Sequence, residues 1–161
     1  MDFALSEQQQ HIVEAVEKVC TPFDADYWLE RDTDGEFPEA FYQALAQSGW
    51  LGIAMPEEFG GADLGITEAA LMMHAIAGTG AGLSGASAVH MNIFGLHPVV
   101  VFGTQEQKQR MLPPLIAGKD KACFAVTEPN TGLNTLKLKT RAVRDGDHYV
   151  VHGQKVFIST A

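Results

Sequence analysis

A polar turn that follows an apolar run is the part of this chain whose residue types are best suited to hold a ligand. Residues 122–134 read Ala-Cys-Phe-Ala-Val-Thr-Glu-Pro-Asn-Thr-Gly-Leu-Asn, which predicts a buried strand that leads into a turn. Thr127 would place a hydroxyl beside several unpaired backbone N–H groups, Pro129 fixes φ, and Gly132 can adopt a positive φ. Such a turn suits a flat ligand with a polar edge, and a plain hairpin corner is the alternative.

A glycine-rich stretch earlier in the chain matches a second ligand-binding pattern. Residues 80–85, Gly-Ala-Gly-Leu-Ser-Gly, spell G-x-G-x-x-G, which binds dinucleotides where it joins a strand to a helix. The residues before it have the periodicity of a helix, so we interpret the small residues as a tight junction between helices.

The sequence contains no spacing typical of a metal site, a P-loop or a nucleophile elbow. His148 and His152 lie four apart, on one face of an expected strand but too far apart to share a small ion. Cys20 and Cys123 are distant in sequence and are expected to be free thiols. We therefore predict no bound metal.

Residues 123–132 closely resemble the flavin-contacting signature of the acyl-CoA dehydrogenases. Residues 49–61, 102–108, 112–115 and 145–159 resemble further stretches of that family and occur in the family order. The resemblance spans nearly the whole chain. It implies an FAD-dependent oxidoreductase of fatty acid metabolism that converts an acyl-CoA thioester to the trans-2-enoyl-CoA.

The resemblance also implies which residues contact FAD. The expected contacts are Phe124, Val126, Thr127, Gly132, Leu133, Phe157, Ile158 and Ser159. The first three would meet the flavin ring, with the Thr127 hydroxyl and N–H at its polar edge. Gly132 and Leu133 would lie by the pyrophosphate, and residues 157–159 would form a second wall.

Four positions depart from the usual family residues. Leu133 stands where Ser is usual, and its side chain cannot donate a hydrogen bond to a phosphate or a substrate. Asn134 stands where Asp is common, Phe157 replaces Trp, and Ser159 replaces Thr. The change at Leu133 affects substrate recognition more than flavin binding.

No residue of this chain is expected to be catalytic. In the family the base is a Glu from a later helical domain, and Glu128 occupies a structural place in the signature. We expect the 161 residues alone to be inactive. The resemblance further implies an electron-transfer flavoprotein as acceptor and assembly as a homotetramer.

Two other functions stay open. The same scaffold serves flavin monooxygenases and oxidases, which differ in how the reduced flavin reacts with oxygen. The chain could instead be a non-enzymatic binding or interaction module that associates through an exposed sheet edge.

The elements that must position these residues follow from periodicity. We expect a mainly α fold: a helical domain over residues 1–120, then the opening strands of a β domain over residues 121–161. The family resemblance implies the same order, with the strands as the start of an acyl-CoA dehydrogenase-type β-barrel domain and with the family's C-terminal helical domain absent from this chain. We expect five helices. The first begins at a capping box formed by Ser6 and Gln9, the second spans 39–47, and the third begins at a cap on Thr67. The fourth spans 87–102 with a break near His97, and the fifth runs from a capping box at Thr104 and Gln107 to Gly118. Residues 24–37 are expected to be irregular. Asp145-Gly146 predicts a type I′ hairpin, and residues 156–158 a strand.

Charge and composition exclude some partners. The net charge is −9, and the acidic first 60 residues argue against nucleic acid. The basic residues Lys137, Lys139 and Arg141 lie two positions apart, which would place them on one face of a strand. That face could meet an anionic ligand, or it could simply be the solvated face of the strand. No uninterrupted apolar run is long enough to span a membrane, and the start lacks the features of a signal peptide or presequence. A cytoplasmic protein is expected.

Overall fold

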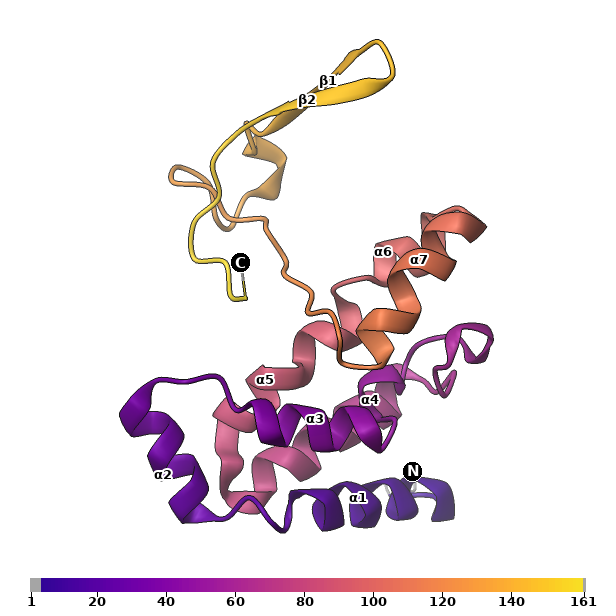
Figure 1. The fold of residues 1–161 in the computed structure, drawn as a ribbon, viewed down its shortest axis with the longest axis vertical. Helices are drawn as coiled ribbons and strands as arrows, with labels where there is room; N and C mark the ends of the chain where they lie inside the picture. Colours follow the sequence, from indigo (N-terminus) through magenta and orange to yellow (C-terminus); the bar gives the residue numbers. More distant parts are fainter. Residues whose placement is uncertain (1–3, 161) are drawn as a thin grey trace. The chain divides into compact units, whose positions relative to one another are not determined.

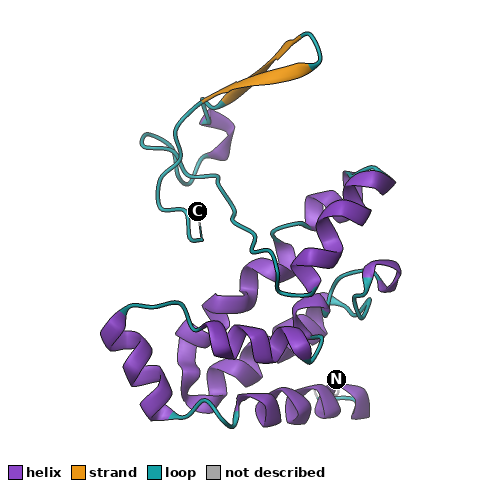
Figure 2. Ribbon diagram, viewed as in Figure 1, coloured by secondary structure: helices purple, strands orange, loops and turns teal. Residues whose placement is uncertain are grey.

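The computed structural model describes residues 4–160 and divides into two units, one up to Ala122 and one from Cys123. The first unit is helical, and the strands lie in the second (Figure 2). The boundary expected from the sequence lies after residue 120, two residues before the division in the structure. The main elements, in chain order, are α1 (Glu7–Cys20), α2 (Ala25–Asp34), α3 (Glu39–Gln47), α4 (Ile66–Ile76), α5 (Gly82–Phe94), α6 (His97–Phe102), α7 (Gln105–Ile116), β1 (Arg141–Asp145) and β2 (His148–His152). Short helical turns, η1 (Trp50–Gly52), η2 (Glu57–Phe59), η3 (Ala77–Ala81) and η4 (Thr135–Lys137), connect them.

Local caps start the helices. The capping boxes predicted for α1 and α7 are confirmed: Ser6 Oγ accepts from Gln9 N, and Thr104 Oγ1 accepts from Gln107 N, each at 3.2 Å. The α4 cap was predicted wrongly. Its N-cap is Gly65, whose N–H donates to Glu68 Oε2 at 3.1 Å. Glu68 also accepts from Gln9, which ties the start of α4 to α1.

Residues 24–37 are not irregular, because α2 occupies most of this segment. Asp24 Oδ1 accepts from Tyr27 N at 3.1 Å, and Gly35 closes the helix with a φ of 72°. The Trp28 indole donates to Phe23 O at 3.0 Å. Aromatic packing therefore holds an acidic helix that has no fully buried residue.

The glycine-rich stretch forms a junction between α4 and α5, as predicted. Gly80 and Gly82 have positive φ values of 90° and 56°, which break the helix inside the π turn η3. A Cβ on Gly85 would lie 2.5 Å from Ala81 Cβ and 3.2 Å from Ile76 Cγ2. These glycines serve close packing. The helix expected at 87–102 was placed too late in the sequence, since α5 already begins at Gly82. Its expected break near His97 is confirmed, because α5 ends at Phe94 and α6 begins at His97.

The core of the first unit lies among α1, α3, α4 and α5. α1 packs against α3 and α4, and α5 packs against α3 and α4 (Figure 1). The largest fully buried side chains of this core include Val16, Phe41, Tyr42, Leu45, Leu51, Ile53, Met72, Ile76 and Val89. A smaller apolar cluster forms around Leu112 and Leu115 of α7 and packs on Met55 and Phe59.

The run Ile66–Phe102 is long and apolar enough to cross a membrane by composition, with a mean hydropathy of 1.3 in its best window. A spanning helix needs unbroken backbone hydrogen bonding, and this run is broken at Gly80 and again before α6. Some of its residues, such as Met72 and Val89, belong to the core. The absence of a membrane span stays a prediction.

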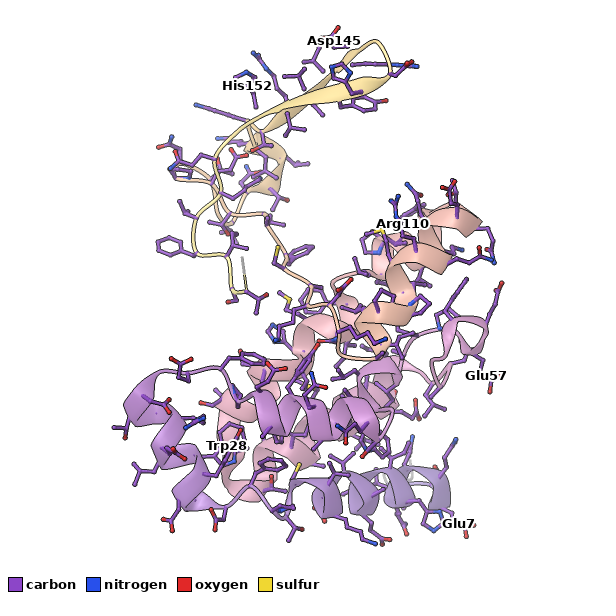
Figure 3. All side chains as sticks on the ribbon, in the orientation of Figure 1. Glu7, Trp28, Glu57, Arg110, Asp145 and His152 are labelled. Carbon is purple, nitrogen blue, oxygen red and sulfur yellow. The ribbon has the colours of Figure 1, made fainter. Side chains whose placement is uncertain are left out.

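The second unit holds one antiparallel hairpin, in which Arg141 pairs with His152 and Asp145 with His148. Figure 3 labels Asp145 near the loop of the hairpin and His152 toward its other end. Its loop is Gly146-Asp147, with a positive φ at Gly146 and none at Asp147. That pattern fits type II′, so the predicted type I′ turn was wrong. The strands predicted before Thr127 and at 156–158 are absent from the described residues. Both segments are irregular there, and Val156 N donates to Thr127 O without forming a ladder.

Candidate functional site

The predicted turn after Thr127 is present. Glu128 N donates to Thr131 O at 2.9 Å, and Thr131 N donates to Glu128 O at 3.1 Å. This pair of bonds closes a tight turn through Pro129 and Asn130. Gly132 does not adopt a positive φ, so that prediction was wrong and the turn closes before it.

Glu128 lies inside this turn and is only 7% exposed. Its carboxylate accepts from Lys139 N at 2.7 Å and from Thr140 N at 2.8 Å. Lys155 Nζ lies 3.1 Å from Glu128 Oε1. A buried carboxylate is stable only with such partners, so the structural role predicted for Glu128 is confirmed.

These partners hold the pKa of Glu128 at about 2, well below its usual value of 4.5. The Thr140 side chain is the largest cause, followed by the Lys139 and Thr140 N–H groups, with Lys155 contributing less. Thr140 Oγ1 is buried and forms no hydrogen bond within the described residues, so the hydrogen bonds that hold the charge come from the two backbone N–H groups and Lys155. Glu128 is therefore an anion at neutral pH. A carboxylate with so low a pKa, whose oxygens already accept from three donors, is a weak proton acceptor.

Lys155 brings the second predicted segment beside the first. Its ammonium donates to Val126 O at 2.8 Å as well as to Glu128. The next residue, Val156, donates its N–H to Thr127 O at 3.0 Å. The residues that follow, 157–159, therefore start directly beside Thr127.

The predicted ligand-contacting residues fall into two groups. Val126, Thr127 and Ile158 are half-buried around the contact between the two segments, and Phe124 and Phe157 are exposed nearby in sequence. Leu133 is fully exposed, and Gly132 and Ser159 are exposed too. The two segments are linked at Thr127 and Val126, through Val156 N and the Lys155 ammonium, and Leu133 makes neither of these links.

The Thr127 hydroxyl has no hydrogen-bond partner within residues 4–160, and neither do the N–H groups of Thr127, Gly132 and Leu133. Thr127 is half-buried, so its polar atoms lie at the edge of the two segments rather than in open solvent. Such groups can donate to the polar edge of a ligand. This arrangement fits a flavin ring, whose polar edge needs donors.

Sequence reasoning missed three residues that build this site: Lys155, Thr140 and Gly153. A Cβ on Gly153 would lie 2.1 Å from Thr140 Oγ1 and 2.7 Å from its Cβ, so only glycine allows the close approach. The available signal was Glu128 itself, because a carboxylate in an apolar setting requires a cation and backbone donors.

The first unit contains a separate hollow of about 550 Å³ beside the α4–α5 junction. Trp28, Leu29 and Arg31 of α2 line it, together with Gly80 and Ser84. The glycines that resemble a dinucleotide motif thus border a mixed apolar and charged hollow. Among the described residues, no group of His, Cys, Asp and Glu has the geometry of a metal site.

Comparison with known proteins identifies relatives of the whole chain. The family model for the acyl-CoA dehydrogenase N-terminal domain matches residues 6–119. A probable acyl-CoA dehydrogenase of Bacillus subtilis, YngJ, is 36% identical over 161 residues, which is all of this chain and 42% of that protein. The chain therefore spans about two-fifths of the relatives it matches.

Two solved structures share the fold. Butyryl-CoA dehydrogenase of Megasphaera elsdenii has a TM-score of 0.84 and 29% identity, over 98% of this chain and 42% of that one. PigA with FAD and proline has a TM-score of 0.89 and 28% identity, over 98% of this chain and 42% of that one. With a matching family model over most of the first unit and relatives along the full length, this chain belongs to the acyl-CoA dehydrogenase family.

Proposed function

We propose that this chain is the N-terminal part of an FAD-dependent acyl-CoA dehydrogenase, which converts an acyl-CoA to the trans-2-enoyl-CoA. The observation that carries the proposal is the contact between two segments of the second unit, where Val156 N donates to Thr127 O and the Thr127 hydroxyl stays without a partner in the described residues. Relatives named as acyl-CoA dehydrogenases support the reaction, and a neighbour that contains FAD supports the cofactor.

Val126, Thr127 and Ile158 would hold the flavin ring, with Phe124 and Phe157 as apolar walls. When bound, FAD supplies the hydride acceptor for the substrate Cβ. The Thr127 hydroxyl and N–H would donate to the polar edge of the ring. Donors at that edge stabilise the negative charge that builds up on reduction, so Thr127 would act on both binding and potential.

The phosphate side of the cofactor must be held differently from the usual family pattern. Leu133 is fully exposed, and its side chain offers no donor. The N–H groups of Gly132 and Leu133, which have no partner within residues 4–160, would serve instead. Backbone donors can cradle a phosphate without any side chain.

No residue of this chain is assigned as the base, because the low pKa of Glu128 and its buried contacts exclude the one local carboxylate considered. We expect residues 1–161 alone, with FAD and an artificial electron acceptor, to form no enoyl-CoA. Formation of enoyl-CoA by this piece would refute that expectation.

A second candidate is a flavin enzyme acting on another substrate, since the neighbour PigA holds FAD with proline. Fast reaction of the reduced protein with oxygen would favour a monooxygenase or oxidase. A binding or interaction module is the third candidate, and concentration-dependent oligomers without flavin would favour it.

We further propose an electron-transfer flavoprotein as acceptor, a homotetramer, a cytoplasmic location and a role in fatty acid metabolism. The family resemblance supports the acceptor, the assembly and the pathway. Light scattering of the purified full-length protein and fractionation of its source cells test the assembly and the location.

The decisive experiment is Thr127→Val in the full-length protein. The change removes the hydroxyl at nearly constant volume, and loss of one hydrogen bond weakens FAD binding by about 1 kcal/mol, or roughly fivefold. Thr135→Val is the control, because Thr135 is exposed and its hydroxyl makes no hydrogen bond within residues 4–160. Equal FAD affinity in both variants and the parent would rule out the proposed role of the Thr127 hydroxyl.

A further inference from the structure

The second unit is organised around a buried charge rather than an apolar core. Among the described residues after Ala122, the buried side chains are those of Glu128 and Thr131, both polar. The hairpin is exposed along both strands. The relative positions of the loops in this unit therefore depend on polar contacts.

Glu128 connects three segments of this unit. It lies in the turn at 128–131. It accepts hydrogen bonds from the N–H groups of Lys139 and Thr140, which directly precede β1, and from the ammonium of Lys155. Lys155 in turn donates to Val126 O. The pair thus joins the segment that contains Thr127 to the segment that leads into Phe157.

A backbone hydrogen bond also joins these two segments. Val156 N donates to Thr127 O at 3.0 Å. A backbone bond of this kind fixes a distance at one point, and it does not by itself set the orientation of two irregular segments. The contacts of Lys155 with Glu128 Oε1 and Val126 O supply the additional points that hold one geometry.

We propose that Glu128 and Lys155 are positioning residues for FAD, which fix the distance between the segments at 124–127 and 157–159 so that both can face the flavin ring. This inference rests on the proposed function. Neither side chain needs to touch FAD, since Glu128 is buried and the Lys155 ammonium is occupied by two oxygens. Pre-set spacing lowers the ordering cost of binding.

The test measures FAD binding to the full-length apoprotein by flavin fluorescence, for Lys155→Met, Lys155→Arg and Glu128→Gln. Lys155→Met keeps the chain length and removes both donors, so we expect FAD affinity to fall about tenfold or more. Lys155→Arg retains a cation and should restore most of that loss. The Glu128 carboxylate accepts from three donors, and Glu128→Gln replaces one of its oxygens with an amide group that can only donate. We therefore expect Glu128→Gln to weaken FAD binding at least as much as Lys155→Met does.

Lys119→Met is the matched control, because Lys119 is exposed and lies in the first unit. It should leave FAD affinity within twofold of the parent. Amide hydrogen exchange of the apoprotein provides a readout that needs no flavin. Exchange at Thr140 and Val156 should accelerate in Lys155→Met and Glu128→Gln and stay unchanged in Lys119→Met.

The outcomes separate this inference from the proposed function. A parent protein that binds no FAD overturns the proposed function and with it the role toward FAD, while the exchange data still decide whether the pair fixes the segments. A parent that binds FAD, with Lys155→Met equal to Lys119→Met in affinity and exchange, overturns the positioning role alone. If Glu128→Gln does not fold, the two Lys155 variants decide the question, because the carboxylate then keeps its backbone donors.

Discussion

Removing the Tyr42 hydroxyl is expected to destabilise the helical unit measurably, because this oxygen connects three helices in the core. Tyr42 of α3 is fully buried, and Asn92 of α5 is 2% exposed. The hydroxyl receives Asn92 Nδ2 at 3.1 Å and lies 3.3 Å from Asp120 O, just after α7. Asn92 Nδ2 also lies 3.3 Å from Leu115 O.

In Tyr42→Phe the amide of Asn92 keeps only its longer contact with Leu115 O, and the carbonyl of Asp120 loses a donor. Leaving a buried polar group short of a partner costs about 1–3 kcal/mol. For a protein of this size each kcal/mol lowers Tm by roughly 2–4 °C, so we expect a fall of about 2–12 °C. Burial raises the pKa of the Tyr42 phenol, so the neutral hydroxyl is the relevant form at neutral pH.

Thermal unfolding followed by far-UV circular dichroism measures this effect. Tyr149→Phe is the control, because Tyr149 is 64% exposed on β2 and its change should cost less than about 0.5 kcal/mol. Asn92→Leu and the double variant complete a cycle. The double variant should cost less than the sum of the single changes by about 1 kcal/mol. A Tm for Tyr42→Phe within 1 °C of the Tyr149→Phe control, or strict additivity, would show that the buried contacts contribute nothing.

Two further predictions concern the second unit. The pKa of Glu128 is lowered from 4.5 to about 2, so its contribution to stability is complete above pH 4.5 and is lost as the pH falls through 2. An NMR titration of the Glu128 carboxyl carbon should therefore have its midpoint near 2, and a midpoint near 4.5 would contradict the contacts described. Gly153→Ala would place a Cβ 2.1 Å from Thr140 Oγ1 and should lower Tm, with a strain of about 1–3 kcal/mol. Gly132→Ala is the matched control, since its Cβ would meet only Thr127 Cγ2 at 3.8 Å, and equal unfolding curves for the two variants would exclude the steric argument.

Features encoded by neighbouring residues were predictable from the sequence. The capping boxes at Ser6 and Thr104 need only a residue and its partner three positions on, and both formed as expected. The helix at 39–47 and its closing Gly49, with a φ of 81°, follow from the same kind of local signal. The glycine-rich junction was also predictable, because the residues before it had helical periodicity.

Features that depend on distant partners could not be predicted from the sequence. α2 was missed because its acidic sequence buries no residue fully. Its stability depends on aromatic contacts of Tyr27 with Phe23 and of Trp28 with Phe41. The cap of α4 is the bond from Gly65 N–H to the Glu68 side chain. Thr67 was expected to be the cap instead, because threonine is a common N-cap residue. The strand expected at 122–126 has a suitable composition, but a strand exists only where another one pairs with it.

The candidate site divides in the same way. The turn at Thr127 and the structural place of Glu128 could be read from residues 122–134. The partners of Glu128 lie 11, 12 and 27 positions further along the chain, and no local spacing marks them. Their identification required the fold.

Family membership and the flavin site rest on different residues, and this difference determines which experiment is informative. The family model covers residues 6–119, and all the predicted FAD-contacting residues lie after that range. A relative that is 36% identical over all 161 residues extends the family to the second unit but does not say which of its side chains contact FAD. Leu133, fully exposed and unable to donate, shows that the phosphate side cannot simply be transferred from the family. The ring side is different, because this chain itself supplies its contacts: Val156 N donates to Thr127 O, and Lys155 pairs with Glu128. Measurements of FAD binding on variants of Thr127 and Lys155 therefore test the ring side directly.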